Sequence, residues 1–346
     1  MKEKRVLLVR VGKLGDTIWG VAPIDGLMKY YGPDVKIDLV VKNGMAGLFA
    51  HDPRVYRVFE ITKKRLPLLL SPAKLQVLWH SIRAPYDLAL DMETEPFFRS
   101  LFLLLRAKKK MSAYKIRHDL RTPTEHAVLS VRKIARLAIS QDLAEAVAPK
   151  LVVTRGSGRN ALIPVEGNYI CLHLGNSWIA SGREDLRAWP RERWRQLLQE
   201  WSAYFPNHVP VILGTAFEKG LAASITAGLE GCIDLCGKTD MQQMMDVISG
   251  SDAFIGTDTG PTHMAAAIGV PVVSVFGPTR PQQTGPFADG SNLVEILSAN
   301  LPCSPCVHTS QFRTCERNRC MEAVTPAMVA NAVRAIIQLR QHRSPW

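Results

Sequence analysis

The sequence lacks any apolar segment long enough to cross a membrane as a helix. Its uninterrupted apolar runs are short, and the run at residues 101–105 has only five residues, whereas a membrane-spanning helix needs roughly 20. The chain starts with Lys2-Glu3-Lys4-Arg5 and continues directly into an apolar segment, which differs from the pattern of a secretory signal peptide. We therefore expect a cytoplasmic protein without a membrane span.

Two familiar nucleotide-binding signatures are also missing. The loop Gly12-Lys13-Leu14-Gly15 follows an apolar segment, but it has neither the G-x-G-x-x-G spacing of a dinucleotide site nor the spacing of a P-loop. Aromatic residues make up only 7% of the chain and are not interleaved with its Lys and Arg clusters, which argues against single-stranded nucleic acid as a partner. These absences disfavour a dinucleotide enzyme, a P-loop ATPase and a nucleic-acid binder.

Acidic residues are scarce relative to basic ones in the first half only. Residues 1–150 hold 27 Lys and Arg against 15 Asp and Glu, whereas residues 151–346 hold 16 of each. A solvated basic face that serves solubility accounts for such a surplus. Attraction to a polyanion, such as nucleic acid, anionic lipid head groups or a phosphorylated substrate, accounts for it equally well. The two halves are therefore expected to meet different partners.

Short apolar segments alternate with helical segments through both halves. Strands are predicted near residues 6–9, 37–41, 55–61, 87–91, 169–173, 209–213, 232–235, 253–256 and 272–275. Helices are predicted near residues 16–31, 69–82, 96–105, 125–140, 191–204, 218–229, 241–249, 262–268 and 327–339. This alternation indicates parallel sheets with helices on both faces. We predict an α/β protein with two Rossmann-like domains, 1–155 and 165–324, whose ligands bind at strand carboxyl ends facing a central cleft.

The loop Gly12-Lys13-Leu14-Gly15-Asp16-Thr17 joins the first predicted strand to the first predicted helix. Glycines there let the backbone approach a ligand, and a helix start favours an anion. Asp16 has two interpretations: it is either a first-turn acid that complements the helix dipole or a general base that faces the cleft.

The segment Asp258-Thr259-Gly260-Pro261-Thr262-His263 lies between an apolar strand and an apolar helix start. Hydroxyls, a glycine and free helix amides in such a place are typical of a phosphate site, and the imidazole adds a donor with tunable charge. An ordinary capped turn uses the same residue types, so that alternative stays open.

Two further loops follow predicted strands of the second half. Gly175-Asn176-Ser177 precedes Arg187 and a helix that starts with proline, an arrangement that suits a diphosphate. Glu218 follows another strand and either accepts hydrogen bonds from ribose hydroxyls or caps a helix. Trp189 and Trp194 are expected to be packing residues.

Four of the seven cysteines form the pattern C-x2-C-x8-C-x4-C in a polar, irregular stretch. They are Cys303, Cys306, Cys315 and Cys320. Thiols at this spacing can hold zinc or iron tetrahedrally, and the expected cytoplasmic location disfavours disulfides. We expect a structural metal ion there, with free or partly oxidised thiols as the alternative.

Together the motifs resemble glycosyltransferase family 9, the ADP-heptose:lipopolysaccharide heptosyltransferases. The motifs that carry the resemblance occur in order along essentially the whole chain: Gly12-Lys13-Leu14-Gly15-Asp16-Thr17, Arg187-Ala188-Trp189-Pro190, Glu218-Lys219, Asp258-Thr259-Gly260-Pro261-Thr262-His263 and Phe276-Gly277-Pro278-Thr279. The resemblance implies a GT-B fold with an acceptor-binding N-terminal domain and a nucleotide-sugar-binding C-terminal domain. It also implies that the last helix, within residues 325–346, packs back on the N-terminal domain.

The resemblance further implies an inverting transfer of heptose from ADP-L-glycero-β-D-manno-heptose to the inner core of lipopolysaccharide, with Asp16 as the general base. The donor would be bound by Arg187, Glu218, Asp258, Thr259, Gly260 and His263, with loop contacts from Lys13, Gly15, Thr17, Asn176 and Ser177. Arg187 stands where the family often has lysine, so it offers a forked donor in place of a point charge. The chain has no D-x-D motif, and we expect no cofactor for catalysis.

The acceptor is left open. The basic first half fits an anionic glycolipid at the cytoplasmic face of the inner membrane, with the enzyme attached peripherally. The cysteine tetrad occurs in only some members of the family, including protein-modifying relatives, so a protein acceptor is an alternative. A nucleotide-sugar epimerase of the same GT-B fold is a further one, and it would consume the donor without an acceptor.

Overall fold

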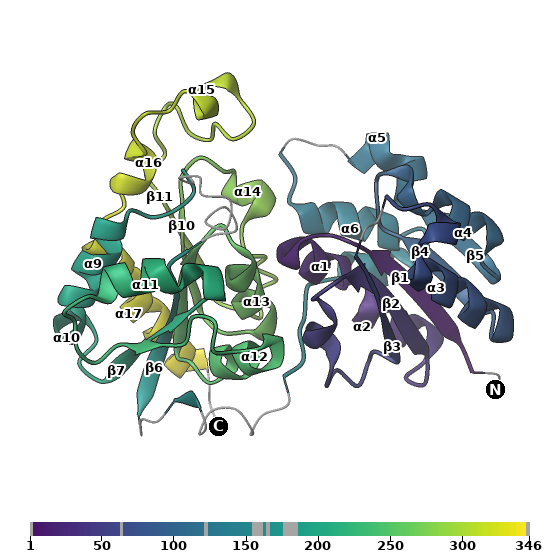
Figure 1. The fold of residues 1–346 in the computed structure, drawn as a ribbon, viewed down its shortest axis with the longest axis horizontal. Coiled ribbons are helices and arrows are strands. Elements are labelled where there is room, and N and C mark those ends of the chain that lie inside the picture. Colours follow the sequence, from purple (N-terminus) through teal and green to yellow (C-terminus); the bar gives the residue numbers. More distant parts are fainter. Residues whose placement is uncertain are drawn as a thin grey trace. The chain divides into compact units, whose positions relative to one another are not determined.

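The computed structural model describes residues 3–62, 65–120, 124–153, 162–163, 167–175 and 186–343. The chain divides into two compact units, Met1–Val152 and Val153–Trp346, and each is built on one parallel sheet with helices around it (Figure 1). Within the described ranges, no helix has the length and apolar character needed to cross a membrane. The α/β class predicted for both halves is confirmed.

The sheet of the first unit has the strand order β3-β2-β1-β4-β5, and every neighbouring pair is parallel. Its strands are β1 (Arg5–Arg10), β2 (Lys36–Lys42), β3 (Arg57–Ile61), β4 (Tyr86–Asp91) and β5 (Ala107–Ser112). Strand β1 is central, since Val9 pairs with Val40 on one side and Asp91 on the other. A central parallel strand is covered on both faces, which explains the unbroken apolar run of β1.

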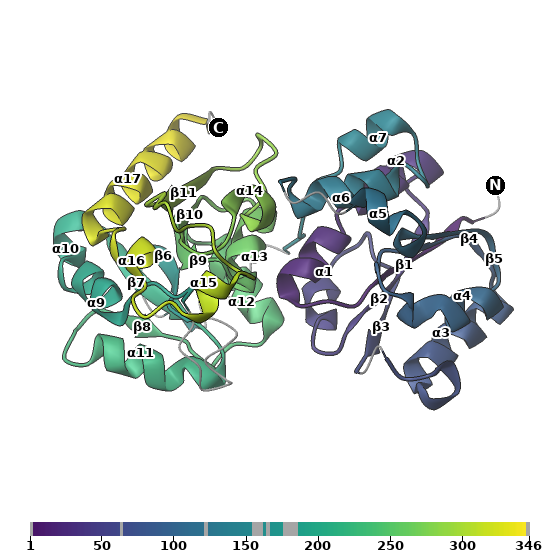
Figure 2. The ribbon, with the colours of Figure 1, turned by 90° about the horizontal axis from the view of Figure 1, so that it is seen from above.

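Helices lie on both faces of this sheet. They are α1 (Leu14–Gly20), α2 (Ile24–Tyr31), α3 (Pro72–Arg83), α4 (Arg99–Leu104), α5 (Arg117–Leu120), α6 (Ala127–Ala135) and α7 (Gln141–Glu145), with the short 3-10 turns η1 (Ala46–Phe49), η2 (Leu68–Leu70), η3 (Pro96–Phe98) and η4 (Ala113–Ile116). In Figure 2, α2, α6 and α7 lie on one side of the strands, and α3 and α4 lie on the other.

The single helix predicted over residues 16–31 is two helices in the structure. Helix α1 ends at Gly20 and α2 begins at Ile24, directly after Pro23. Proline has no N–H to donate and its ring clashes with the preceding turn, so it ends a helix that reaches it. The break leaves Asp16 as the third residue of the short helix α1.

Two strands are absent from the sequence prediction, and both lie at an edge of their sheet. Strand β5 reads Ala-Lys-Lys-Lys-Met-Ser, with Lys108 and Lys109 exposed. Strand β11 (Val294–Ser298) is half-buried along most of its length. Edge strands need little apolar surface and often carry lysine, which discourages pairing with another chain. Apolar periodicity therefore does not reveal them.

The second unit contains the strand order β11-β10-β9-β6-β7-β8, again entirely parallel. Its remaining strands are β6 (Asn168–His173), β7 (His208–Leu213), β8 (Ile233–Asp234), β9 (Ala253–Thr257) and β10 (Val272–Phe276). Its helices are α9 (Arg191–Gln199), α10 (Trp201–Tyr204), η6 (Ala216–Glu218), α11 (Lys219–Thr226), α12 (Met241–Ser249), α13 (Gly260–Ile268), α14 (Pro281–Thr284), α15 (Ser310–Arg313), α16 (Arg319–Glu322) and α17 (Pro326–Arg343).

Helix α17 packs against α9 and strands β9, β10 and β11 of the second unit. Its apolar residues Val329, Ala330 and Val333 are fully buried in the core of that unit. Burial of this stripe accounts for the amphipathic pattern seen in the sequence. The predicted packing of residues 325–346 on the first domain stays a prediction.

In both sheets the strand order reverses once, and it does so beside the first strand of the unit. The chain proceeds from β1 through β2 to β3 and then returns to the other side of β1 with β4. It likewise proceeds from β6 through β7 to β8 and returns beside β6 with β9. Ligands of open parallel sheets bind outside the carboxyl ends of the strands at such a reversal. The loops after β1, β4, β6 and β9 are therefore the places to examine for a site.

Candidate active site

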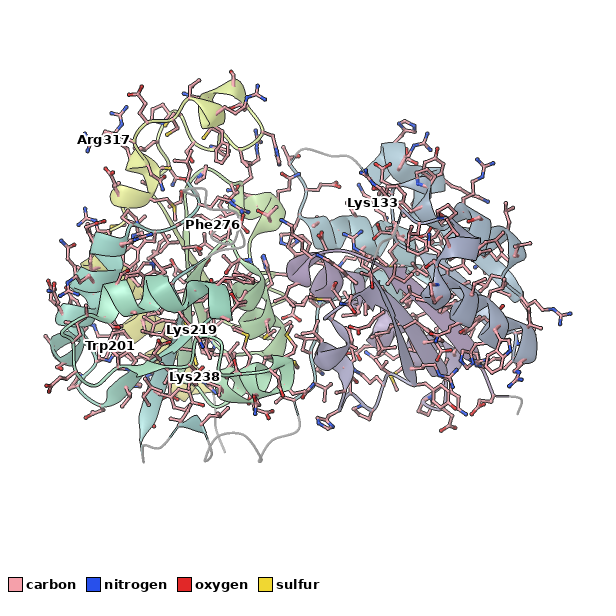
Figure 3. All side chains as sticks on the ribbon, viewed as in Figure 1. Lys133, Trp201, Lys219, Lys238, Phe276 and Arg317 are labelled. Carbon is pink, nitrogen blue, oxygen red and sulfur yellow. The ribbon has the colours of Figure 1, made fainter. Side chains whose placement is uncertain are left out.

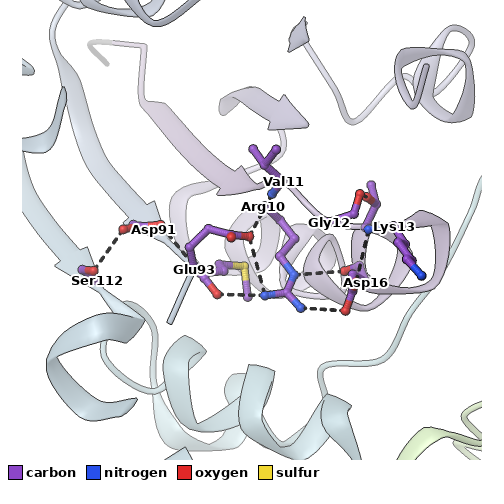
Figure 4. A network of polar contacts seen from close by, with 10 residues as sticks. Arg10, Val11, Gly12, Lys13, Asp16, Asp91, Glu93 and Ser112 are labelled. Atoms are coloured by element: carbon purple, nitrogen blue, oxygen red, sulfur yellow. Dashed lines mark hydrogen bonds and ion pairs between the residues drawn. The ribbon is translucent and has the colours of Figure 1, made fainter. Parts of the chain in front are cut away.

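The carboxylate of Asp16 is fixed at the reversal of the first sheet by the last residue of β1 (Figure 4). Arg10 Nη2 lies 3.1 Å from Asp16 Oδ1, and Arg10 Nε donates to the main-chain oxygen of Asp16 at 3.2 Å. The main-chain N–H of Lys13 donates to Asp16 Oδ2 at 3.2 Å. The side chain is still 39% exposed. Asp16 is thus oriented by fixed partners while its carboxylate remains accessible.

Two further carboxylates extend this network beneath the loop. Glu93 Oε1 accepts from the main-chain N–H of Val11 at 3.0 Å and lies 3.8 Å from Arg10 Nη1. Asp91, the last residue of β4, accepts from the N–H of Glu93 and the hydroxyl of Ser112, both at 3.0 Å. Burial raises the pKa of Asp91 to about 7. The network therefore joins the ends of β1, β4 and β5 behind Asp16.

The loop residues predicted as contacts have different surroundings. Lys13 is exposed and Gly15 is half-buried, whereas Thr17 is fully buried and its hydroxyl lies 3.5 Å from the carbonyl oxygen of Gly12. A Cβ on Gly12 would lie 2.4 Å from Asp16 Cβ, so the loop needs glycine at that position. Thr17 therefore serves the loop's own packing, while Lys13 lies at the surface.

At the reversal of the second sheet, close polar contacts join the segments that follow β6, β7 and β9. His173 Nδ1 lies 3.2 Å from the hydroxyl oxygen of Thr259, and His173 Nε2 lies 3.1 Å from Glu218 Oε1. Thr259 Oγ1 is also 3.2 Å from Thr262 Oγ1. All four residues are buried. This chain of contacts holds together residues that the sequence separates by as much as 89 positions.

Thr259 is the N-cap residue of α13, yet its hydroxyl bonds His173 and Thr262 and does not cap the first turn. Asp258 lies just before it, with Oδ1 3.7 Å from His263 Nε2 and Oδ2 3.4 Å from the Thr284 hydroxyl. Gly260 begins the helix. Asp258, Thr259, Gly260 and His263, which the sequence predicts to bind the donor, are thus brought together at one helix start, where main-chain amides favour an anion.

Glu218 has both of its carboxylate oxygens engaged within the unit. Thr215 donates to Oε2 through its N–H at 2.7 Å and its hydroxyl at 2.9 Å, and His173 contacts Oε1. Burial raises the pKa of Glu218, but the contacts with His173 and Thr215 outweigh it, and the pKa is lowered overall. A Cβ on Gly175 would lie 2.0 Å from Oε1, so a side chain at that position would displace this carboxylate. The structure gives Glu218 the capping role, and ribose binding stays a prediction.

Of the remaining predicted donor residues, Arg187 is described by the structure and lies just before the packing tryptophans. Arg187 is half-buried in the turn before Trp189. Trp189 donates its Nε1–H to the oxygen of Val324 at 2.9 Å and packs edge-on against Trp194, with both rings buried. The expectation that these two rings serve packing is confirmed. Asn176 and Ser177 lie outside the described residues.

The four cysteines near the carboxyl end line one pocket of about 410 Å³. Cys306 and Cys320 are buried, whereas Cys303 and Cys315 are exposed. Cys315 Sγ contacts the main-chain oxygen of Arg317 at 3.2 Å, in the segment marked by that residue in Figure 3. Among the described residues, which include all four thiols, no three Cys, His, Asp or Glu side chains are placed to hold a metal ion. The predicted structural zinc or iron site is therefore not supported.

The network residues that the sequence prediction lacks include Arg10, Glu93 and His173. Each lies at the end of a strand or in the following turn. Their positions at strand carboxyl ends were the available signal, since such residues meet at one edge of a parallel sheet. Arg10 and His173 each reach a carboxylate that a loop brings in, Asp16 and Glu218 respectively.

Solved heptosyltransferases have the fold described here. The structure of the E. coli ADP-heptose lps heptosyltransferase II aligns with a TM-score of 0.74 at 18% identity, covering 98% of this chain and 99% of that chain. The predicted GT-B class is confirmed by this likeness. The family model described as glycosyltransferase family 9 (heptosyltransferase) matches residues 76–315. The chain belongs to glycosyltransferase family 9 and is a transferase.

Other relatives cover nearly the full length of the chain. Lipopolysaccharide heptosyltransferase 1 of Pseudomonas aeruginosa is 27% identical over 371 residues, covering 96% of this chain and 98% of the relative. The iron-containing dodecameric glycosyltransferase TibC of enterotoxigenic E. coli aligns with a TM-score of 0.56 at 12% identity, covering 98% of this chain and 78% of that chain. The likeness to TibC concerns the fold alone.

Proposed function

We propose that this enzyme transfers heptose from ADP-L-glycero-β-D-manno-heptose to the inner core of lipopolysaccharide with inversion at the anomeric carbon. Membership in glycosyltransferase family 9 and the full-length similarity to a lipopolysaccharide heptosyltransferase support the reaction class. The observation that carries the mechanism is Asp16, whose carboxylate is accessible and is oriented by Arg10 and the N–H of Lys13.

Asp16 acts as the general base in this proposal. The acceptor hydroxyl gives its proton to the Asp16 carboxylate as its oxygen forms a bond to the anomeric carbon. The bond between that carbon and the diphosphate oxygen breaks, and its electron pair leaves with ADP. One displacement inverts the configuration, so a single carboxylate suffices and no covalent glycosyl-enzyme forms.

The negative charge that develops on the departing ADP requires stabilisation. The first turn of α13, with Thr259 and Gly260 at its start, offers main-chain amides, and His263 adds a side-chain donor. Arg187 supplies a forked guanidinium for the diphosphate. Asp258 orients His263, and Glu218 receives the ribose hydroxyls once the donor is bound. Asn176 and Ser177 contribute loop contacts to the same donor.

The acceptor we propose is an anionic glycolipid at the cytoplasmic face of the inner membrane, where the enzyme associates peripherally. The surplus of 12 basic residues in residues 1–150 supports this choice, because phosphorylated glycolipids and anionic lipids attract such a surface. The neutral second half fits a partner of a different kind, the nucleotide-sugar donor.

The decisive experiment compares Asp16→Asn with Asp25→Asn, which changes another first-turn acid, in α2. Loss of a general base typically costs roughly 10²- to 10⁴-fold in rate. We expect Asp16→Asn to lose heptose transfer to truncated core glycolipid by that factor while ADP affinity, measured by calorimetry, is kept. Asp25→Asn is expected to match the wild type. If Asp16→Asn kept the full rate of heptose transfer, Asp16 would not be the general base.

The same assay separates the alternative reactions. Transfer of heptose to candidate polypeptides, with none to core glycolipid, would establish a protein acceptor. Consumption of ADP-heptose without any acceptor would establish an epimerase. Mass spectrometry of core oligosaccharide from cells lacking this protein then tests whether one heptose is missing.

A further inference from the structure

Seven of the twelve large apolar side chains that are exposed in the described structure lie between residues 69 and 104. They are Leu69, Leu70, Leu75, Trp79, Ile82, Leu103 and Leu104, here called the leucine–tryptophan surface. Leu69 is 81% exposed and Leu103 is 72% exposed. Single exposed apolar residues are normal, but a concentration of them marks contact with a partner or a membrane.

These side chains come from three neighbouring elements of the first unit. The turn η2 directly precedes α3 and packs against it, and α3 also packs against α4. Helices α3 and α4 lie side by side on one face of the sheet in both views (Figures 1 and 2). The seven residues are therefore gathered in one region of the fold.

Helix α3 buries Val77 in the core of the unit, but it also carries an apolar stripe on its outward side. Leu75, Trp79 and Ile82 follow the i, i+4, i+7 spacing of one helix face, and all three are exposed. On the inward side, Lys74 and Ser81 are buried. Packing within the unit does not explain the outward stripe, because a helix that served only the core would bury these side chains.

The buried Lys74 links the segments that carry the leucine–tryptophan surface. Its Nζ donates to the main-chain oxygens of Leu66 at 2.7 Å and Phe97 at 3.0 Å. Leu66 precedes η2, and Phe97 belongs to η3, which leads directly into α4. One ammonium group thus ties together the segments that carry Leu69, Leu70, Leu103 and Leu104. The exposed leucines are presented by a fixed platform.

Basic residues outnumber acidic ones around this surface, although Asp87 of β4 pairs with Lys108 at 2.7 Å. Residues 61–86 and 96–118, which include all three elements, contain 12 Lys and Arg and no Asp or Glu. The guanidinium of Arg83 lies 3.6 Å from the centre of the Trp79 ring, and Lys110 Nζ donates to the oxygen of Leu103 at 3.2 Å. Positive charge therefore lies directly beside the apolar side chains.

We propose that the leucine–tryptophan surface docks on an anionic lipid bilayer. The leucines and Ile82 enter the boundary between head groups and acyl chains, and Trp79 lies at the level of the head groups, where tryptophan is enriched. Arg83, Lys110 and the neighbouring lysines contact lipid phosphates. Apolar insertion and electrostatic attraction then act together, as stable peripheral binding requires.

A second copy of this chain is a poorer occupant of the surface. A two-fold interface would bring the same basic residues of both copies together, and like charges in contact oppose association. An anionic bilayer supplies the opposite charge as well as an apolar layer. The inference rests on the proposed action at a membrane-borne glycolipid, but vesicle binding is measured without any transfer reaction.

The test uses the full chain and sedimentation with vesicles, either of phosphatidylcholine alone or of phosphatidylethanolamine with phosphatidylglycerol. We expect binding to the anionic vesicles only, weakened by salt because the electrostatic part is screened. The double changes Leu69→Ser/Leu70→Ser and Leu103→Ser/Leu104→Ser each remove two inserting side chains and are expected to lower partitioning by roughly tenfold or more. Leu339→Ser changes an exposed leucine of α17 and is expected to bind like the wild type.

Thermal unfolding of each variant checks its folding, and these exposed positions should leave the midpoint unchanged. Equal binding to neutral and anionic vesicles, or unchanged binding by both double variants, would overturn the docking surface. A dimer in sedimentation velocity that the same variants dissociate would assign the surface to self-association. Vesicle binding with no heptose transfer to any acceptor would leave the surface standing and refute the proposed function.

Discussion

The guanidinium of Arg10 contacts Asp16 twice, at the carboxylate Oδ1 (3.1 Å from Nη2) and at the main-chain oxygen (3.2 Å from Nε). Its Nη1 donates to the oxygen of Met92 at 3.1 Å. One side chain at the end of β1 therefore fixes the orientation of the proposed base against the neighbouring strand β4.

Replacing Arg10 should impair the chemical step more than donor binding. Arg10→Lys keeps a positive charge but loses the planar fork that makes these contacts together. We expect kcat to fall roughly 10- to 100-fold, because small errors in the position of a reacting group are costly. Steady-state kinetics with ADP binding as the second readout tests this. Unchanged kcat in both Arg10→Lys and Arg10→Gln would show that Asp16 needs no such support.

The raised pKa of Asp91 predicts a pH-dependent stability difference. Its pKa in the folded protein is about 7, raised by burial, whereas an unfolded aspartate titrates near 4. The stabilising contribution of protonated Asp91 is therefore fully present below pH ~4 and is lost as pH rises through 7, by about 1.4 kcal/mol per pH unit.

Asp91→Asn removes this titration while keeping an amide oxygen as acceptor. We expect the free energy of unfolding of the wild type to fall relative to Asp91→Asn between pH 5 and 8, measured by urea denaturation. Ser112→Ala removes only the hydroxyl that donates to Asp91 and serves as the control with a smaller effect. Parallel pH profiles for wild type and Asp91→Asn would contradict the prediction.

The stability contribution of Glu218 depends on pH in the opposite direction, because the pKa of Glu218 is lowered in the folded protein. Its ionised form stabilises the fold above the unfolded pKa, and this contribution is lost as pH falls through the folded value. Glu218→Gln should cost about 1.5–3 kcal/mol at pH 7, the range for hydrogen bonds to a charged group. The difference in the free energy of unfolding between Glu218→Gln and the wild type should become smaller at acidic pH.

The same variant tests whether Glu218 also binds ribose. If it does, Glu218→Gln weakens ADP binding but leaves the affinity for inorganic diphosphate unchanged. Thr215→Ala is the matched control, since it removes the hydroxyl that donates to Glu218 and leaves the carboxylate. Equal ADP affinity in Glu218→Gln and wild type would confine Glu218 to its capping role.

The cysteine pocket predicts two classes of thiol reactivity. Cys303 and Cys315 are exposed, whereas Cys306 and Cys320 are buried, and burial raises the pKa of Cys320 to about 11. Thiolates are the reactive form, so brief alkylation followed by mass spectrometry should label the first pair before the second. If all four thiols were protected from alkylation and a chelator removed this protection, the prediction would be wrong. The four thiols would then bind a metal ion.

Asp16 and the residues from Asp258 to His263 could be placed from the sequence because their signal is local. Each group lies between an apolar strand and the start of a helix, and parallel topology then brings each loop to the carboxyl edge of its own sheet. The same apolar runs located every described strand except the edge strands β5 and β11. Pro23 was the one local signal that the predicted helix over residues 16–31 did not take into account.

The partners of these residues depend on contacts between distant parts of the chain. Glu93 reaches the N–H of Val11 across 82 positions, and Thr259 meets His173 across 86. No periodicity or turn signature reports such a pairing, since it arises only when the sheet has formed. The cysteine spacing was equally insufficient, because spacing does not fix the directions in which four thiols point.

The lysine-rich strand β5 protects the protein against aggregation through the edge of its sheet. An open sheet edge is a template on which a second chain can add a strand, leading to domain swapping or fibrils. Lys108, Lys109 and Lys110 place three successive positive charges along that edge, so an incoming identical strand meets strong repulsion. Replacing these lysines with threonine or valine would let a second chain pair with the edge strand β5. The protein would then aggregate even with the rest of the fold unchanged.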